Sequence, residues 1–222
     1  MGDDHSGDSA PADDPWAVAD EAALRGLYGT TSERAKAKSL SALDAHCTAF
    51  IERSPFLCLS SQDGSGRADV SPRGDPAGFV RVLDPRTLAV PDRPGNNRLD
   101  TLSNLLANPA VGLLFFVPGY EETLRVNGTA RLTRDPKLLA SLVVKGREPS
   151  LAIVVSVDEA FLHCAKALRR SRLWDPEARR DRREMPSLSK MILDQTVGAP
   201  EDPAEMARID EQLEREYRDS MY

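Results

Sequence analysis

Alternation of apolar and polar residues begins at Ser54 and constrains the fold more than any other feature of this sequence. "FLCLSS" and "RADVSP" flank the glycine-containing loop "QDGSG", a pattern typical of a β-hairpin. "GFVRVLD" and "TLAVP" flank the turn "DPRT", in which Pro85 suits the second turn position. "AVGLLFFV" and "ETLRVNGTARLT" predict a third antiparallel pair. Successive hairpins favour a closed or split antiparallel barrel over a doubly wound sheet.

Helical spacing surrounds and interrupts these strands. Apolar residues at helical intervals predict helices over 15–29, 33–53, 98–107 and 203–219, and a short helix in "DPKLLASLVVKG". "LAIVVSV" and "AFLHCAK" predict two further strands, which makes roughly six or seven in all. The expected fold is therefore mainly β with helices (α+β), an antiparallel split β-barrel with helical extensions at both ends.

The chain divides into four predicted segments. Residues 1–14 are rich in Asp, Ser and Gly and are expected to form a disordered acidic tail. Residues 15–53 are expected to be N-terminal helices packing on the barrel, which itself spans 54–176. Residues 177–222 are interpreted as a linker and an amphipathic helix. A chain of 222 residues is long enough for one substantial core.

Charge and cysteine usage exclude several classes of protein. A net charge of −6 disfavours a nucleic-acid binder, because backbone-phosphate binding needs a basic face. Three scattered cysteines without a CxxC motif fit a reducing cytosol and argue against a disulfide framework. The sequence shows no membrane-spanning apolar run, no basic leader and no histidine cluster with metal spacing. We expect a cytoplasmic protein without metal, membrane or nucleic-acid partners.

The segment "VPDRPGNNRLDTL" places unusual polar residues at the start of the predicted 98–107 helix. Unpaired N–H groups at a helix N-terminus form an anion site. Asn97 can cap the helix, with Asp100 three residues on, and Gly95 permits close backbone approach. Arg98 adds a guanidinium suited to a phosphate. The alternative is an ordinary asparagine cap beside a surface arginine.

A second arginine stands at the end of an earlier strand. Arg73 follows Ser71 by two residues, so both lie on one face of the strand. Because strand ends meet at a barrel rim, Arg73 and Arg98 are candidates to converge on one anion. The alternative is a pair of rim arginines neutralised by Asp69 and Asp75.

Several of these stretches together carry a family resemblance. "PGNNRLDTL", "NPAVGLLFFVPG" and "FLHCAKALRRSRLWDP" resemble the FMN-binding split-barrel flavoproteins of the pyridoxamine 5'-phosphate oxidase-like group, especially a bacterial branch of FMN-dependent members. The resemblance covers about Ser54 to Pro176. It implies an FMN-binding homodimer with two flavins at the subunit interface.

The same resemblance assigns roles to individual positions. Arg73 matches a basic residue that contacts the flavin phosphate or ring edge, and Pro91 and Asp92 match a strand-end pair beside the flavin. Asn97 and Arg98 match a basic pair on the phosphate. Asn97 is a departure, because the better-known oxidases carry a charge there.

Two more departures concern the other side of the flavin. Thr123 stands where the oxidases carry a glutamine that reaches the flavin from the partner chain. His163, on one strand face with Phe161, stands where they carry a tryptophan; its alternative role is a satisfied strand-end histidine. Arg169 or Arg170 corresponds to their substrate-phosphate residue. These departures imply a substrate other than that of pyridoxamine 5'-phosphate oxidase itself.

A basic turn follows His163. A helix would place Lys166, Arg169 and Arg170 on one face, as a grip on an anionic substrate or as a solvated basic face. Trp174 is interpreted as stacking on the flavin or simply packing. Cys164 is expected to point into the core and to be inert.

The resulting hypothesis is an FMN-dependent oxidoreductase acting on an unidentified small molecule. It needs no separate catalytic acid or base, because hydride passes directly to the flavin, and no catalytic residue is assigned. The alternatives are a deazaflavin-dependent reductase on the same fold, a flavin- or haem-binding module without turnover, and a purely structural dimer.

Overall fold

A computed structural model describes residues 14–33 and 37–222 of the chain. The predicted tail over 1–14 therefore lies, except for its last residue, outside the described residues. The chain divides into two compact units, Met1–Lys38 and Ser39–Tyr222, and each is considered by itself.

The first unit contains one described helix, α1 (Glu21–Tyr28). Asp20 caps it by accepting a hydrogen bond from the backbone N–H of Ala23, and the helix ends at Gly29, whose φ is 69°. The helix is thus shorter than the predicted 15–29, although its end is where the sequence placed it. None of its residues is buried, and the predicted packing of this region on the barrel stays a prediction.

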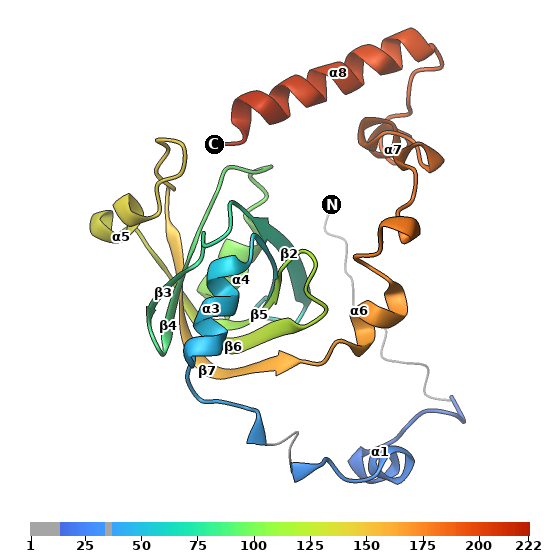
Figure 1. Cartoon of the computed structure of the whole chain (residues 1–222). Coiled ribbons are helices and arrows are strands. Elements are labelled where there is room, and N and C mark those ends of the chain that lie inside the picture. The colour runs from blue at the N-terminus through green and yellow to red at the C-terminus, as the bar shows by residue number, and fades with distance from the viewer. Residues whose placement is uncertain (1–13, 34–36) are drawn as a thin grey trace. The chain divides into compact units, whose positions relative to one another are not determined.

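In the second unit, residues 39–222, seven strands form one antiparallel sheet in the order β2-β1-β5-β6-β7-β4-β3 (Figure 1). The strands are β1 (Phe56–Gln62), β2 (Ala68–Gly74), β3 (Arg81–Asp84), β4 (Thr87–Pro91), β5 (Ala110–Phe116), β6 (Thr123–Thr133) and β7 (Ala152–His163). The three predicted hairpins are confirmed as β1–β2, β3–β4 and β5–β6.

The sheet curls without closing. β2 and β3 are its edges, yet Arg73 on β2 donates a hydrogen bond of 2.8 Å to Asp92, just after β4. The β2 edge therefore approaches the far side of the sheet, as expected for the split barrel. Strict alternation in β1 and β5 sends every second side chain inward, including Leu57, Leu59 and Phe115, all essentially inaccessible.

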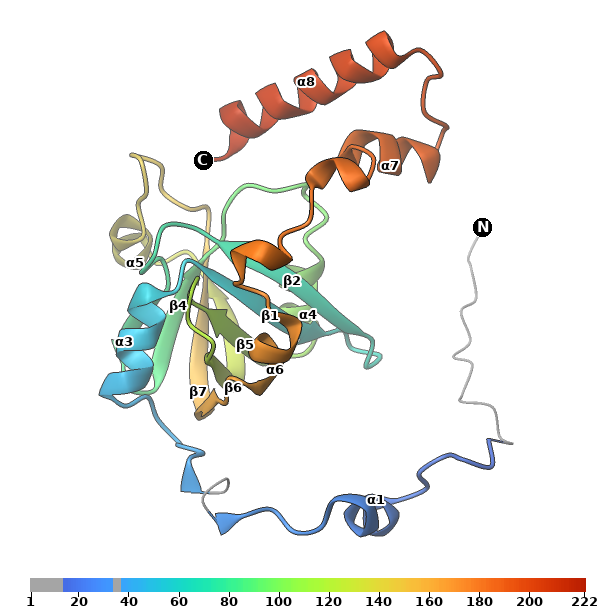
Figure 2. The same ribbon diagram turned by 45° about the vertical axis from the view of Figure 1, so that its right-hand side comes forward.

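Two helices close the core. α3 (Ala45–Arg53) contributes Cys47, Phe50 and Ile51, and α4 (Asp100–Ala107) contributes Leu102 and Leu105. α3 lies against the sheet in both views (Figures 1 and 2). α5 (Pro136–Ser141), the predicted short helix, packs on a smaller cluster with Ala152.

The predicted helix over 33–53 is wrong as one continuous element. Residues 34–36 lie outside the described residues, and Leu40 pairs with Ala160 of β7 as an isolated β-bridge. The helix starts afresh at Ala45, because Asp44 caps it by accepting from the backbone N–H of Cys47 at 2.8 Å.

The two strands predicted from "LAIVVSV" and "AFLHCAK" are one strand, β7. Its pairing with β6 shifts between Asn127, opposite Glu159, and Gly128, opposite Val157. Asp158 is therefore the extra residue of a β-bulge, which absorbs the two consecutive acidic residues without ending the strand.

The chain after β7 is helical. α6 (Lys166–Ser171), the short 3-10 helices η1 (Pro176–Ala178) and η2 (Arg182–Glu184), α7 (Leu188–Asp194) and α8 (Pro203–Ser220) follow in order. α8 confirms the predicted C-terminal helix, and it packs on α7. No described helix has both the length and the apolar character needed to cross a membrane.

Candidate functional site

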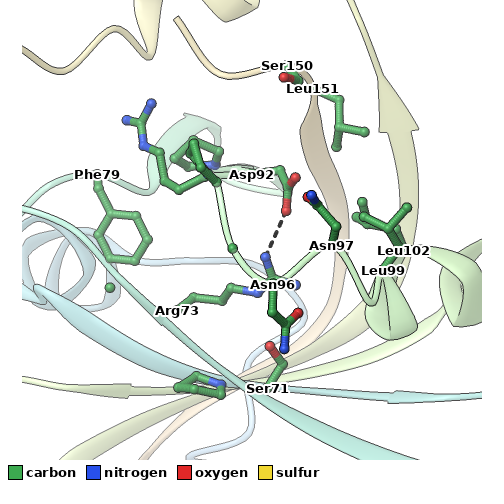
Figure 3. Close-up of a pocket in the computed structure, with 16 residues that line it drawn as sticks. Ser71, Arg73, Phe79, Asp92, Asn96, Asn97, Leu99, Leu102, Ser150 and Leu151 are labelled. Carbon is green, nitrogen blue, oxygen red and sulfur yellow. Dashed lines mark hydrogen bonds and ion pairs between the residues drawn. The ribbon is translucent and has the colours of Figure 1, made fainter. Parts of the chain in front are cut away.

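A cavity of about 780 Å³ lies where the ends of β2 and β4 meet the segment before α4 (Figure 3). Five of the predicted cofactor-binding residues line it together: Ser71, Arg73, Pro91, Asp92 and Asn97. These residues come from separate parts of the chain, and the curl of the sheet brings them to one place.

The guanidinium of Arg73 stands in the cavity wall and forms an ion pair through one of its nitrogens. Its Nη1 donates to Asp92 at 2.8 Å, and the two side chains are 17% and 19% exposed. Its Nε is buried and has no hydrogen-bond partner. Because a guanidinium carries five N–H donors and this side chain is partly exposed in the cavity wall, Arg73 can also donate to a ligand oxygen.

The segment before α4 turns differently from the prediction. Asn97 and Leu99 both adopt left-handed backbone conformations, with φ of 59° and 61°. Leu99 occupies the N-cap position of α4 and makes no side-chain cap hydrogen bond. The predicted cap by Asn97 is therefore wrong: the turn carries Asn97 away from the first helical N–H groups and into the cavity wall. Left-handed conformations are uncommon for leucine, and such strain is often found beside ligand sites.

Arg98 does not line the cavity. Its side chain is 69% exposed, and its Nε donates to Asp100 at 2.7 Å, a hydrogen bond that raises the pKa of the guanidinium. The structure thus places Arg73 and Arg98 in different surroundings rather than on one shared surface. The alternative of arginines neutralised by carboxylates holds with other direct partners, Asp92 and Asp100, while Asp69 adds a smaller electrostatic contribution at Arg98.

Thr123 and His163 are neighbours elsewhere on the sheet. They pair across β6 and β7, and Thr123 is buried. The rings of Phe161 and His163 lie 4.8 Å apart, which confirms that they share a strand face. Pro91 pairs with Ala152 at the opposite end of β7, and neither Thr123 nor His163 lines the cavity.

The basic turn forms α6 and is fastened to the turn that joins β5 to β6. Arg169 donates to Glu121 at 2.6 Å, which raises the pKa of Arg169, and the Trp174 indole donates to the Tyr120 carbonyl at 2.7 Å. Lys166 and Arg170 are exposed on the same short helix. These four predicted substrate residues do not line the cavity either.

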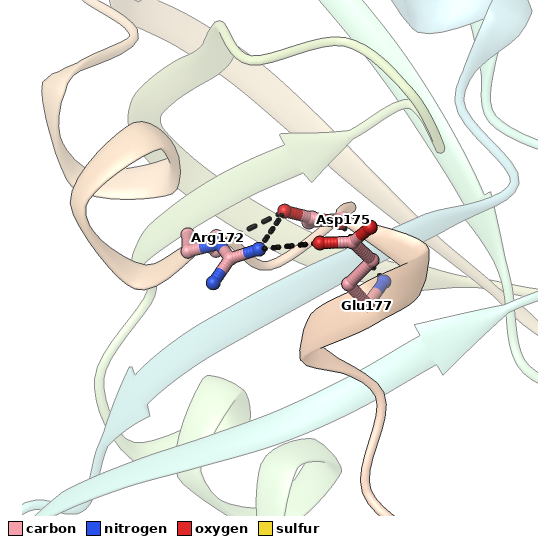
Figure 4. Close-up of polar contacts among 3 residues, drawn as sticks. All are labelled: Arg172, Asp175 and Glu177. Carbon is pink, nitrogen blue, oxygen red and sulfur yellow. Dashed lines mark hydrogen bonds and ion pairs between the residues drawn. The ribbon is translucent and has the colours of Figure 1, made fainter.

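The end of α6 is held by its own ion pairs (Figure 4). Arg172 takes the left-handed C-cap conformation, with φ of 52°, and its Nε donates to Asp175 at 2.8 Å. Glu177 lies 3.5 Å from the same guanidinium. Arg172 therefore fixes the direction of the chain towards Trp174 rather than presenting a free charge.

The cysteines differ from expectation at one position. Cys164 is exposed, so the prediction that it points into the core is wrong: β7 ends at His163, and the alternation that would turn Cys164 inward ends with it. The buried thiol is Cys47, where burial raises the pKa to about 11.

Sequence reasoning missed a second arginine of the cavity. Arg93 lines it, donating from Nε to Asp75 at 2.6 Å and from Nη2 to the Leu142 carbonyl at 2.8 Å. Phe79 and Leu151 add apolar wall. The signal was present in "PDRP", but the partners of Arg93 lie far from it in the sequence, and only the fold brings them together.

Comparison with known proteins places the chain in a family. The family pattern described as "Pyridoxamine 5'-phosphate oxidase" matches residues 43–164, more than half of the chain and all seven strands. The chain therefore belongs to the pyridoxamine 5'-phosphate oxidase family. Among curated proteins, none matches the chain.

Solved structures give a weaker likeness. HupZ from Group A Streptococcus is 15% identical, with a TM-score of 0.44 over 54% of this chain and 93% of that chain. An FMN-binding protein from Syntrophomonas wolfei is 8% identical, with a TM-score of 0.42 over 53% and 83%. An F420 reductase is 20% identical, with a TM-score of 0.37 over 52% and 94%. TM-scores below 0.5 carry no argument about function.

Proposed function

We propose that this protein binds FMN in the cavity and acts as an oxidoreductase on a small molecule. The observation that carries the proposal is the position of Arg73, whose partly exposed guanidinium stands in the wall of a cavity that four other predicted cofactor-binding residues also line. Family membership supports it. A bound flavin supplies hydride and electron transfer, which protein side chains alone do not.

The residues present fit a flavin phosphate. The volume of about 780 Å³ lies within the ~300–1,000 Å³ usual for small-molecule sites. Arg73 offers a charged donor, Ser71 a hydroxyl and Asn97 an amide, while Asp92 offers an acceptor for ring or hydroxyl protons. Phe79 and Leu151 provide apolar contact for a ring. Binding the phosphate through Arg73 would loosen its ion pair with Asp92.

A homodimer is part of the proposal. Thr123, His163 and the α6 residues lie outside the cavity, although the family resemblance assigns them to the flavin and substrate side. A second copy of the chain would bring its own His163 and α6 to the flavin held in this cavity. The site would then be complete only between two chains.

The experiment is to purify the protein, release its cofactor and identify it by mass. FMN released in about one equivalent per chain supports the proposal. If a deazaflavin is released instead, the alternative of a deazaflavin-dependent reductase on the same fold replaces the proposed function. Cofactor bound without reduction by a nicotinamide donor would favour a module without turnover. A protein that takes up no flavin, deazaflavin or haem would leave only a structural role.

A further inference from the structure

The last residue of the chain is anchored beside the cavity. The Tyr222 hydroxyl donates to Asp75 Oδ1 at 2.8 Å, and Lys145 Nζ lies 4.7 Å from the centroid of its ring. The preceding helix, α8, buries none of its residues, and Met221 is 56% exposed. The chain end is thus held by directed contacts, although the helix before it is not held by burial.

Asp75 connects Tyr222 with Arg93. The Asp75 side chain is 1% exposed, and its Oδ2 accepts from Arg93 Nε at 2.6 Å, while Oδ1 accepts from Tyr222. A buried carboxylate needs donors on its oxygens. Here one donor comes from the cavity wall and the other from the end of the chain. The bond to Asp75 also raises the pKa of the Tyr222 hydroxyl.

Both arginines of the cavity face carboxylates. Arg73 pairs with Asp92, and Arg93 pairs with Asp75. A carboxylate that binds a guanidinium through both oxygens fixes its orientation and cancels its charge most fully. Because Tyr222 occupies Oδ1, Asp75 holds Arg93 through one oxygen only. The positive charge of Arg93 is therefore less fully neutralised, and its guanidinium stays closer to the cavity.

We propose that Tyr222 is a positioning residue for anion binding: by holding Oδ1 of Asp75, it keeps Arg93 available to the phosphate of a ligand in the cavity. The inference rests on the proposed function and adds to it a role for Tyr222 in orienting one arginine of the cavity wall. Without the hydroxyl, both oxygens of Asp75 close on Arg93, and the cavity attracts anions less.

The test compares FMN with riboflavin, which has the same ring and lacks the phosphate. In Tyr222→Phe, the Kd for FMN should rise about threefold to tenfold, the range of one lost hydrogen bond, while the Kd for riboflavin stays unchanged. Tyr217→Phe, on the preceding helix α8, is the matched control and should change neither. Flavin fluorescence quenching measures all three proteins.

A double-mutant cycle separates this role from a structural one. In an Arg93→Gln background, Tyr222→Phe should have no further effect on FMN binding, because the group it positions is gone. An equal loss for FMN and riboflavin, an unchanged FMN Kd, or a full effect without Arg93 would each overturn the inference alone. Wild-type protein that fails to bind FMN would overturn the proposed function and the inference with it.

Discussion

Arg73 and Arg98 were equal candidates for phosphate binding in the sequence, but they occupy different environments in the fold. Arg73 is 17% exposed, and one of its buried donors has no acceptor, so its desolvation is only partly compensated. Arg98 is 69% exposed and forms a solvent-exposed ion pair with Asp100. Surface ion pairs of the second kind contribute little, whereas a guanidinium in a cavity wall, largely shielded from water, interacts more strongly with a bound phosphate.

This difference predicts unequal effects on FMN binding. Arg73→Gln should raise the Kd for FMN about tenfold to a hundredfold, as for a lost hydrogen bond to a charged group. Arg98→Gln should raise it less than about threefold, the scale of an exposed charge. Fluorescence titration measures both, with thermal melting as the check on folding. The reverse order of effects would restore the sequence-based interpretation, in which the phosphate sits at the mouth of α4.

Asp44 gives a stability prediction that depends on pH. Its hydrogen bond from the backbone N–H of Cys47 lowers its pKa from the ordinary value of 3.8. A carboxyl group whose pKa is lower in the folded state stabilises the fold above its ordinary pKa, and this contribution declines as the pH falls through the folded value.

Asp44→Ala should therefore cost about 1 kcal/mol of unfolding free energy at pH 7, because the cap of α3 is lost. Asp44→Asn keeps an acceptor but does not titrate, so its stability difference from the wild type should narrow below about pH 4. Urea denaturation at neutral and acidic pH measures both. A difference that widens on acidification would contradict the assignment of the cap.

At the residue scale, the sequence predicted well which residues lie together, but it predicted less well the conformation and contacts of each residue. Ser71, Arg73, Pro91, Asp92 and Asn97 do share one cavity. Strand alternation and position at a strand end suggested Ser71 and Arg73, whereas Pro91 and Asp92 were predicted from the family resemblance. The positive φ of Asn97 left no trace in the sequence, because asparagine serves equally as a helix cap and as a left-handed turn residue.

Among the elements, β6 and β7 form the longest antiparallel pair, and their pairing contains a β-bulge. Gly128 lies directly at the bulge: an added Cβ would stand 1.9 Å from the Ser156 carbonyl oxygen. The shift in pairing that leaves Asp158 unpaired occurs at this point. Only glycine leaves room for the close approach of the Ser156 carbonyl oxygen.

Gly128→Ala should therefore be strongly destabilising, by about 3 kcal/mol or more, because backbone atoms of a central strand must move. Gly112→Ala is the matched control. There the Cβ would meet the Ser60 hydroxyl at 2.6 Å, a side-chain atom that can rotate away. The net change in unfolding free energy should stay within about 1 kcal/mol, because replacing a strand glycine by alanine offsets the cost of moving the Ser60 hydroxyl. Chemical denaturation distinguishes the two, and equal costs would contradict the role given to the bulge.

The same bulge explains why the sequence divided β7 into two strands. Asp158 and Glu159 interrupt the apolar run. From the sequence alone, such an acidic interruption is indistinguishable from a turn between two strands. Similarly, Leu40 keeps helical spacing with the residues of α3 but bridges to Ala160 instead. Local periodicity predicted the regular hairpins well, and it failed where a partner distant in the sequence decides the conformation.

At the scale of the molecule, the predicted site residues form two groups that one chain does not join. The cavity group gathers around Arg73 and Asp92, while Thr123, His163 and α6 stand around the opposite end of β7 from Pro91. If FMN lies between two copies, each flavin touches the cavity group of one chain and the His163 group of the other. This arrangement predicts complementation between variants.

Arg73→Gln should impair both sites of a homodimer, and His163→Ala should do the same through the partner chain. In a heterodimer of the two variants, one site carries both substitutions and the other carries neither. Random pairing of equal amounts should therefore restore about a quarter of the wild-type flavin content, since half of the dimers then hold one intact site. Unfolding and refolding the mixed variants, followed by flavin quantification, measures this recovery. If both residues served the same chain's flavin, every site would carry one of the two substitutions, and mixing would restore nothing.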